Sequence, residues 1–531
     1  MRDETINNRS TAAEQPPAAK PVVAVVGATG YLGGRLVREL VARGQRVRAI
    51  ARSKEKLRCR SGFASADLEL AAADAADPAQ LRKALQGCEA VFHLVRSALR
   101  DPAASSAKDA NAATNVVRAA ELAGVKRLIY LSGIWNETAV RQSPRLRSQV
   151  QVGRILAGGA VPLTWLRTAP ILGSGGALFE IVRNLAERLP VIAAPRWMRC
   201  PVRPVAVQDV VEYLADCLEN PATVGLNIEL LGPDRATLSE IIAMQAEEAG
   251  LPKRLLVPLP FDFVKLGAYG LSHLTPVPAH LAASCLEGLF AAAAAKPGRG
   301  SDVLAVQPTQ LRTTLRIAVR KVRQQLVETC WSDAGEMIAP DWLACDGTAA
   351  AARGIFECNY RVVLDCPPEA VWRVIRAVGG HTGWFFGDIL WRLRGFLDRL
   401  LGGVGASRGR RHSKELAAGD ALDFWRVLLV EENRRLMLLA EMLVPGEAVL
   451  SFSLEPLPGG GCELVQIARF RPQGLFGLAY WYAMAPFHDF LFSGMLRSIA
   501  RRSACNIRQG PEKFTGGGDI CRLPADWGQA G

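Results

Sequence analysis

Residues 21–34 constrain this chain most, because they read as a strand, a glycine-rich turn and a helix in direct succession. The strand, Val22–Val26, is a β-branched apolar run of the kind that lies buried on both faces of a sheet. Gly27, Gly30 and Gly33 follow it, and residues 35–43 carry a helical apolar stripe. This order predicts a turn whose free N–H groups hold a pyrophosphate at a helix N-terminus. The alternative is a structural turn that binds nothing.

Strand and helix patterns alternate over residues 21–250, which predicts an α/β domain with a doubly wound parallel sheet. Ligands of such sheets bind at the carboxyl ends of the strands. We therefore expect a cofactor site built from the turn and from the residues that follow the later strands: Gly27, Ala28, Thr29, Gly30, Tyr31, Leu32, Gly33, Arg52, Ser53, Lys54, Asp74, Arg96, Ser97 and Ser132.

The end of the second expected strand bears on the choice of coenzyme. An Asp or Glu there would bind the ribose hydroxyls of NAD, but this chain has Arg52-Ser53-Lys54. A guanidinium pairs well with phosphate oxygens, so the sequence favours NADP. The alternative is that Arg52 stacks on the adenine and does not discriminate between the two coenzymes. In that case NAD could bind as well.

Three strings carry a family resemblance: residues 25–33, residues 127–133 and residues 204–210. Together they resemble the atypical short-chain dehydrogenase/reductases, and most of all the NmrA-like branch. The resemblance covers about residues 21–250 and implies a Rossmann domain with a small C-terminal lobe for substrate. It places Asp209 at a helix start, where we expect an N-cap rather than a chemical role.

The chain departs from that family in the acid–base pair. Catalytic members resemble one another in a Tyr-x-x-x-Lys helix, but Arg145 and Gln149 stand at those positions here. Gln149 supplies no charge, and Arg145 stays protonated. Ser132 remains as a candidate for binding a carbonyl. Two hypotheses follow. The chain is an NADP-dependent oxidoreductase or isomerase of a small apolar carbonyl compound, or it is a non-catalytic NADP(H) redox sensor whose C-terminal domain binds an apolar ligand or a partner.

Residues 351–510 change character. A strand, a helix, several antiparallel strands and a long helix over residues 474–501 resemble the α+β helix-grip fold of START-like and polyketide-cyclase-like proteins. Local Trp, Gly and Arg strings resemble a bacterial domain family of unassigned function. This fold implies an apolar cavity, for which we expect the lining Trp481, Tyr482, Met484, Phe487 and His488. The alternative is that these residues are only core.

Length and composition limit the number of domains, the kinds of partner and the chemical state of the cysteines. A chain of 531 residues needs two or three cores, and we expect tails at residues 1–20 and 511–531 and a helical lobe and linker at 251–350. The net charge of +13 fits a solvated basic surface, and no nucleic-acid or membrane-surface contact is expected. Twelve scattered Cys predict neither a metal site nor a disulfide framework, and favour reduced thiols in a cytoplasm. The oligomeric state is not indicated.

Overall fold

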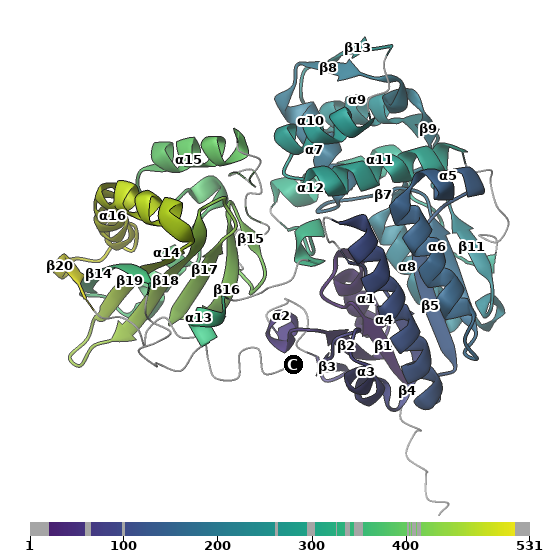
Figure 1. Cartoon of the computed structure of the whole chain (residues 1–531), viewed down its shortest axis with the longest axis horizontal. Helices are drawn as coiled ribbons and strands as arrows, with labels where there is room; N and C mark the ends of the chain where they lie inside the picture. The colour runs from purple at the N-terminus through teal and green to yellow at the C-terminus, as the bar shows by residue number, and fades with distance from the viewer. Residues whose placement is uncertain are drawn as a thin grey trace, which may run out of the picture.

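The computed structural model describes residues 21–58, 65–97, 101–260, 264–294, 303–324, 326–334, 340–344, 354–400, 403, 405, 410 and 416–515. The expected tail at 1–20 lies outside these residues, and of the tail at 511–531 only residues 511–515 are described. Figure 1 shows two domains side by side, each built on its own sheet.

The first domain is organised around a sheet of seven parallel strands among the described residues, in the order β11-β6-β5-β4-β1-β2-β3. The order reverses between β1 and β4, as in a doubly wound fold, and this confirms the predicted fold class. The strands are β1 (Val22–Val26), β2 (Arg46–Ala51), β3 (Leu68–Ala72), β4 (Cys88–His93), β5 (Arg127–Gly133), β6 (Leu163–Thr168) and β11 (Asn227–Leu230).

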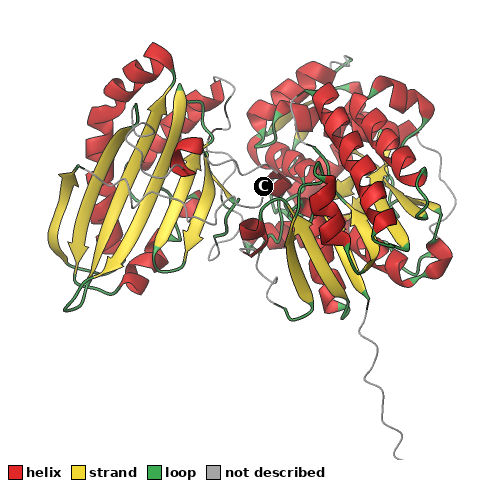
Figure 2. Ribbon diagram, turned by 60° about the horizontal axis from the view of Figure 1, so that its bottom comes forward, coloured by secondary structure: helices red, strands yellow, loops and turns green. Residues whose placement is uncertain are grey.

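Helices cover both faces of this sheet (Figure 2). One core joins the sheet to α1 (Tyr31–Ala42) and α8 (Val207–Glu219). The core on the opposite face includes α3 (Pro78–Leu85), α4 (Pro102–Leu122) and α6 (Pro144–Ala157). Two short helices lie at the sheet's carboxyl edge, α2 (Lys54–Arg58) and α5 (Glu137–Gln142).

A helical lobe with its own core stands above that edge. Its helices are α7 (Ala177–Arg188), α9 (Leu238–Glu248), α10 (Val264–Leu274), α11 (Ala279–Ala294) and α12 (Leu311–Arg323). Two-stranded pairs brace it: β7 (Ile171–Leu172) with β10 (Val205–Ala206), β9 (Pro201–Val202) with β12 (Ala236–Thr237), and β8 (Val191–Ala194) with β13 (Leu255–Pro258). Asp209 is not an N-cap, because it lies within the first turn of α8, whose N-cap is Ala206. Its carboxylate instead accepts two hydrogen bonds from Thr309.

The second domain is built on an antiparallel sheet of seven described strands, in the order β15-β16-β17-β18-β19-β14-β20. These are β14 (Phe356–Leu364), β15 (Ala421–Leu422), β16 (Trp425–Glu431), β17 (Arg435–Ala440), β18 (Gly446–Pro456), β19 (Cys462–Pro472) and β20 (Ile507–Phe514). The boundary expected at residue 510 is therefore too early, since β20 pairs with β14 as far as Phe514.

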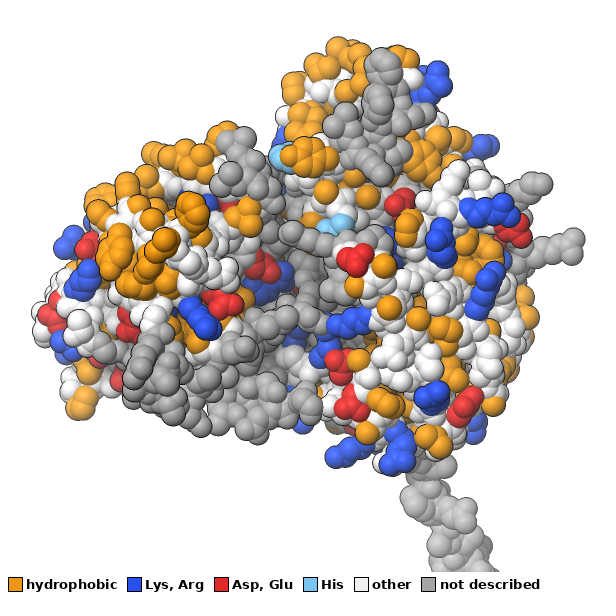
Figure 3. All heavy atoms as spheres, viewed as in Figure 1, with side chains coloured by type: hydrophobic (Ala, Val, Ile, Leu, Met, Phe, Trp, Pro, Cys, Tyr) orange, Lys and Arg blue, Asp and Glu red, His pale blue; other side chains and the backbone are white. Residues whose placement is uncertain are grey.

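One face of this sheet carries the long helix α16 (Gly474–Arg502), with α14 (Pro368–Ile375) beside it. On the other face lies the short α13 (Asp341–Ala344), which joins a separate small core. A further helix, α15 (Asp388–Leu400), lies next to α16, and hydrophobic side chains gather over these two helices (Figure 3). The START-like assignment stays a prediction.

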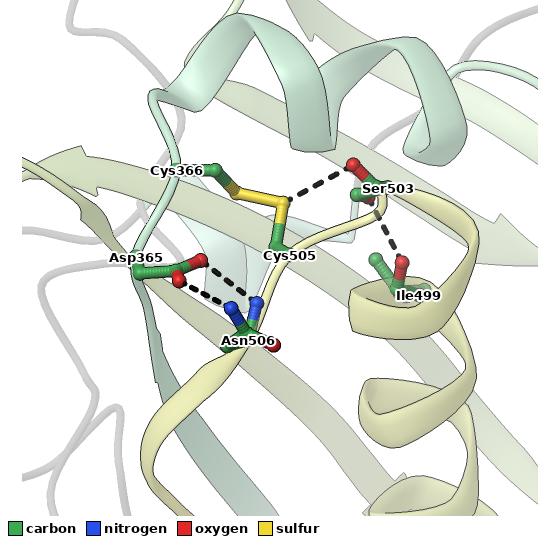
Figure 4. Close-up of a disulfide and its surroundings, with 6 residues drawn as sticks. All are labelled: Asp365, Cys366, Ile499, Ser503, Cys505 and Asn506. Carbon is green, nitrogen blue, oxygen red and sulfur yellow. Dashed lines mark hydrogen bonds between the residues drawn. A yellow bond between two sulfur atoms is a disulfide. The ribbon is translucent and has the colours of Figure 1, made fainter.

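A disulfide joins Cys366, just before α14, to Cys505, just after α16 (Figure 4). The same junction is held by Asp365, whose carboxylate accepts hydrogen bonds from the backbone and side-chain N–H groups of Asn506. This pairing corrects the expectation of reduced thiols for these two of the twelve cysteines. They are 139 residues apart, so their spacing along the chain does not reveal the contact.

Candidate coenzyme and substrate site

The glycine turn after β1 is packed so tightly that two of its positions admit only glycine. Gly27 has a φ of 95° and lies against the backbone of Leu94. A Cβ on Gly33 would lie 2.2 Å from the Gly27 carbonyl oxygen. Gly30 differs, because a Cβ there would meet only that same oxygen, at 3.3 Å. Its outer side is open toward a pocket.

Helix α1 begins at this turn with Gly30 as its N-cap, and no side chain caps it. The first-turn N–H groups of Tyr31, Leu32 and Gly33 therefore have no intrahelical acceptor. They lie at the positive end of the helix dipole and border the pocket. A pyrophosphate fits this cradle in both shape and charge.

The pocket has a volume of about 590 Å³ and extends from the glycine turn to the lobe. Its size is within the range of small-molecule and cofactor sites. The structure brings most of the predicted residues to its wall: Gly27, Thr29, Gly30, Tyr31, Leu32, Gly33, Arg52, Asp74, Arg96, Ser97 and Ser132.

Three predicted residues do not line the pocket. Ala28 is buried in the domain core. Ser53 immediately precedes α2, and its hydroxyl accepts a hydrogen bond from the Lys56 backbone N–H. Lys54 is the first residue of that helix. The basic triplet expected to bind a 2′-phosphate is thus reduced to Arg52 at the pocket wall.

Arg52 and Asp74 lie on the same part of the wall, after β2 and β3. Burial lowers the pKa of Arg52, and the charge of Asp74 opposes that shift. The Asp74 carboxylate also accepts the Ala76 N–H at 2.9 Å. A guanidinium that suits a phosphate and a carboxylate that suits ribose hydroxyls are both present, so the preference for NADP stays a prediction.

Ser132 is buried and its hydroxyl is already engaged. It donates to the Gly133 carbonyl at 3.1 Å and accepts from the Trp165 indole N–H at 2.9 Å. The candidate role in binding a carbonyl therefore conflicts with the hydrogen bonds Ser132 makes. Its hydroxyl instead orders the end of β5 at the pocket floor.

Gln149 takes a structural role at the position where the resembling enzymes have a Lys. Its side-chain oxygen accepts the Gly133 N–H at 2.7 Å, which ties α6 to the end of β5. Tyr130, on β5, donates its hydroxyl to the Gln149 backbone carbonyl at 3.1 Å. Burial raises the pKa of Tyr130, so this phenol is a poor acid.

Arg145 lies on α6 at the pocket wall, in the position of the absent Tyr. No described residue lies within hydrogen-bonding or ion-pairing distance of its guanidinium. Burial and the neighbouring charge of Arg96 lower the pKa of Arg145, while Glu287 and Asp109 oppose the shift. The group still carries its charge at neutral pH and is a donor without an acceptor in a pocket.

The lobe adds polar groups that reasoning from the sequence missed. Cys285 and Glu287, both on α11, line the pocket opposite the sheet. Burial raises the pKa of Cys285 to about 11. Glu287 accepts a hydrogen bond from the hydroxyl of Ser143, which also caps α6. No local signal marks these residues, because α11 meets α6 only through the tertiary fold.

One wall of the pocket comes from a strap that follows α12. We define the strap as residues 327–334. Thr329 accepts a hydrogen bond from Arg35 and donates one to the Tyr31 carbonyl. Trp331 lines the pocket, and its backbone N–H donates a hydrogen bond to the Gly175 carbonyl at 2.8 Å.

The same strap reaches the second domain. The Ser332 carbonyl accepts from Arg426 of β16 at 3.0 Å, and the Asp333 carbonyl accepts from Lys56 of α2 at 2.5 Å. The pocket wall and the second domain therefore share one short segment of chain.

In the second domain, the residues expected to line a cavity divide between two faces of α16. Trp481 is buried and stacks on Phe470. Tyr482 and Phe487 are 66% and 48% exposed, so they do not line an enclosed cavity. Met484 and His488 are half-buried, and burial lowers the pKa of His488 to about 4. The expectation is wrong for the two exposed residues because α16 presents only one side to the sheet.

Comparisons with known proteins give matches in two separate parts of the chain. Residues 27–160 match a family described as NAD(P)H-binding, and residues 353–495 match a family described as a protein of unknown function (DUF2867). The first domain is an NAD(P)-binding Rossmann domain. The second match confirms the resemblance to a domain family of unassigned function.

Curated relatives match less than half of the chain. The divinyl chlorophyllide a 8-vinyl-reductase of Zea mays is 27% identical over 234 residues, which are 41% of this chain and 57% of the relative. Cinnamoyl-CoA reductase 1 of Oryza sativa subsp. japonica is 37% identical over 117 residues, 21% of this chain and 34% of the relative. The chain thus spans about a third to three fifths of the curated relatives it matches.

Among solved structures, the Citrobacter sp. triphenylmethane reductase complexed with NADP(H) is similar, with a TM-score of 0.46 and 23% identity. The alignment covers 56% of this chain and 99% of that one. In the described part of this chain, no helix combines the length and hydropathy required to cross a bilayer.

Proposed function

We propose that the chain is an NADP(H)-dependent reductase of a small, largely apolar compound with a polarised double bond. The observation that carries the proposal is the pocket itself. It runs without interruption from an uncapped helix N-terminus to a wall of Leu146, Ile171, Leu178 and Trp331, with the unpaired Arg145 nearby. The names of the curated relatives, a vinyl-reductase and a cinnamoyl-CoA reductase, support reduction.

When bound, NADPH supplies the hydride. The residues of the chain then have three tasks in the proposed reaction. The glycine turn and α1 hold the pyrophosphate, and the apolar wall excludes water from the substrate. Arg145 donates hydrogen bonds to the substrate oxygen on which negative charge develops. Burial raises the pKa of Cys285, so its thiol is a weak acid like the Tyr130 phenol, and the reduced oxygen takes its proton from solvent.

The test is oxidation of NADPH by the purified chain with a panel of conjugated aldehydes, ketones, thioesters and quinones. We expect turnover with at least one class, and we expect Arg145→Gln to reduce it without weakening NADPH binding. If the chain binds NADPH tightly but oxidises it with no compound of the panel, the reductase proposal is contradicted.

A second candidate function is redox sensing, and the strap is the observation that favours it. Trp331 contacts the pocket while its neighbour Ser332 accepts from Arg426 of the second domain. In this case NADP⁺ and NADPH should bind with different affinities and change hydrogen exchange in β16 differently. Equal affinities and identical exchange would contradict the sensor.

A further inference from the structure

Helix α16 is apolar on both of its sides, although only one side has a partner within the domain. Toward the sheet it presents Trp481, Leu491, Met495 and Ile499, which are buried. Its outward side exposes large apolar residues from Leu475 to Phe490, at helical spacing over about four turns. A helix that is apolar all round is normally covered on all sides.

Helix α15 extends this exposed surface. Phe386, which precedes α15, makes an edge-on contact with Phe490 of α16 at a centroid distance of 5.1 Å. We define the apolar face as the large side chains of the two helices that are between 47% and 86% exposed: Ile389, Leu393, Phe396, Leu397, Leu475, Phe476, Tyr482, Phe487 and Phe490. Figure 3 shows hydrophobic side chains gathered over both helices on the side turned to the viewer.

Among the described residues of these two helices, the exposed charged side chains are arginines, except for Asp489, whose side chain is 46% exposed and forms an ion pair with Lys513. Arg497 and Arg501 are exposed and continue the outward stripe of α16, and Arg392 is exposed on α15. The acidic residues of the two helices are engaged in hydrogen bonds: Asp388 accepts from Trp384, Asp398 from Gly405 and Leu443, and Asp489 from Tyr360 and Lys513.

We propose that the apolar face docks on an anionic lipid surface, with the aromatic side chains in the headgroup region and the arginines on the lipid phosphates. Exposed Phe, Leu and Tyr beside Arg, without free carboxylates, is the pattern of an interfacial membrane contact. A second copy of this chain fits less well, because it would bring Arg against Arg with no acidic partner. This proposal departs from the expectation from the sequence, in which no membrane-surface contact is formed.

The experiment uses the full chain and measures co-flotation with vesicles of phosphatidylcholine, with and without phosphatidylglycerol. We expect binding to the vesicles that contain phosphatidylglycerol, weakened by added salt because the arginines are exposed. The double variant Phe476→Ser/Phe487→Ser should lower the partition coefficient by about tenfold or more. Arg497→Gln/Arg501→Gln should lower binding several-fold on the anionic vesicles only.

Leu122→Ser is the matched control, because Leu122 is 72% exposed on α4 of the first domain. It should bind vesicles like the unaltered chain. Absence of binding at low salt, or binding that none of the face variants changes, would overturn the proposal. So would a stable dimer by light scattering that the Phe476→Ser/Phe487→Ser variant dissociates, since a second copy would then cover the face.

Discussion

Arg145 is the residue on which the proposed chemistry depends, because it places an unpaired positive charge where the resembling enzymes have a Tyr. Arg145→Gln removes the charge and most of the donors. We expect kcat to fall by about 100- to 1,000-fold, as for loss of one donor to a developing oxyanion. Arg145→Lys should keep part of the rate. Unchanged steady-state kinetics in both variants would remove Arg145 from the mechanism.

Gly30 tests the pyrophosphate cradle directly. Gly30→Asp puts a carboxylate at the uncapped N-terminus of α1, where the phosphates are expected to bind. We expect NADP⁺ affinity, measured by calorimetry, to fall at least about 100-fold through charge repulsion and lost space. Gly30→Ala is the control for folding, because its Cβ meets only the Gly27 oxygen at 3.3 Å. Full affinity in the Asp variant would place the coenzyme elsewhere.

Arg52 tests the choice between coenzymes. Arg52→Asp replaces a group that suits a 2′-phosphate with one that suits ribose hydroxyls. The ratio of NADP⁺ to NAD⁺ affinity should fall by about tenfold or more. Because Asp74 shares this part of the wall, an unchanged ratio would mean that Arg52 does not read the phosphate.

For single residues, the sequence predicts those features that depend only on neighbouring residues, such as the glycine positions of the turn after β1. The glycine positions follow from their spacing after a buried strand, and the structure shows the contacts that demand glycine at two of them. The hydrogen bond to the Ser132 hydroxyl could not be predicted, because its donor, Trp165, lies on the neighbouring strand β6. Glu287 and Ser143 meet across 144 residues, and no short pattern records such a contact.

Among the elements, the strap is the one that joins the site to the rest of the molecule. Thr329→Val keeps the shape of the side chain but removes its hydrogen bonds to Tyr31 and Arg35, and leaves the Arg35 Nε–H buried without that acceptor. We expect the free energy of unfolding to fall by about 1–3 kcal/mol in urea titrations. Coenzyme affinity should fall as well, because Thr329 positions the first turn of α1.

Thr314→Val is the matched control for the strap. Its hydroxyl bonds only to the preceding turn of its own helix, α12, far along the chain from the glycine turn. Coenzyme affinity should be unaffected in this variant. Equal losses of affinity in the two variants would show that the strap has no special relation to the pocket.

Most helices and strands could be predicted from the periodicity of apolar residues. The exceptions are segments whose structure depends on contacts with distant parts of the chain. The long helix at residues 474–501 was predicted because its apolar run continues without the interruptions that separate neighbouring strands. Helix α16 matches it closely. Helix α12 ends at Arg323, and the strap that follows it forms hydrogen bonds with Arg35 and Gly175 of the first domain. Strand β20 was missed because its residues are polar and its pairing with β14 spans most of the domain.

For the molecule as a whole, the disulfide closes the second domain at the two ends of its core. Cys366→Ser removes a cross-link between residues 139 apart. We expect the unfolding free energy of this domain to fall by about 2–5 kcal/mol, as for loss of a native disulfide that closes a long loop. Calorimetry should show a lower Tm for this domain and an unchanged transition for the Rossmann domain. Two transitions that shift together would indicate that the domains unfold as one unit.

The two-domain plan could be predicted from the change in pattern near residue 351, but the contacts between the domains could not. Arg426 and Lys56 reach the strap from opposite domains, and their sequence contexts are an ordinary strand and an ordinary short helix. The apolar face was likewise concealed, since the sequence of α16 does not show which of its apolar sides packs on the sheet.

A crystal structure of the full chain with NADP⁺ would show directly where the coenzyme binds. We expect the pyrophosphate to lie against the N–H groups of Tyr31, Leu32 and Gly33, and the nicotinamide end to lie in the part of the pocket lined by Arg145 and Cys285. A coenzyme bound away from the glycine turn, or no coenzyme in crystals soaked well above a measured Kd, would contradict this expectation.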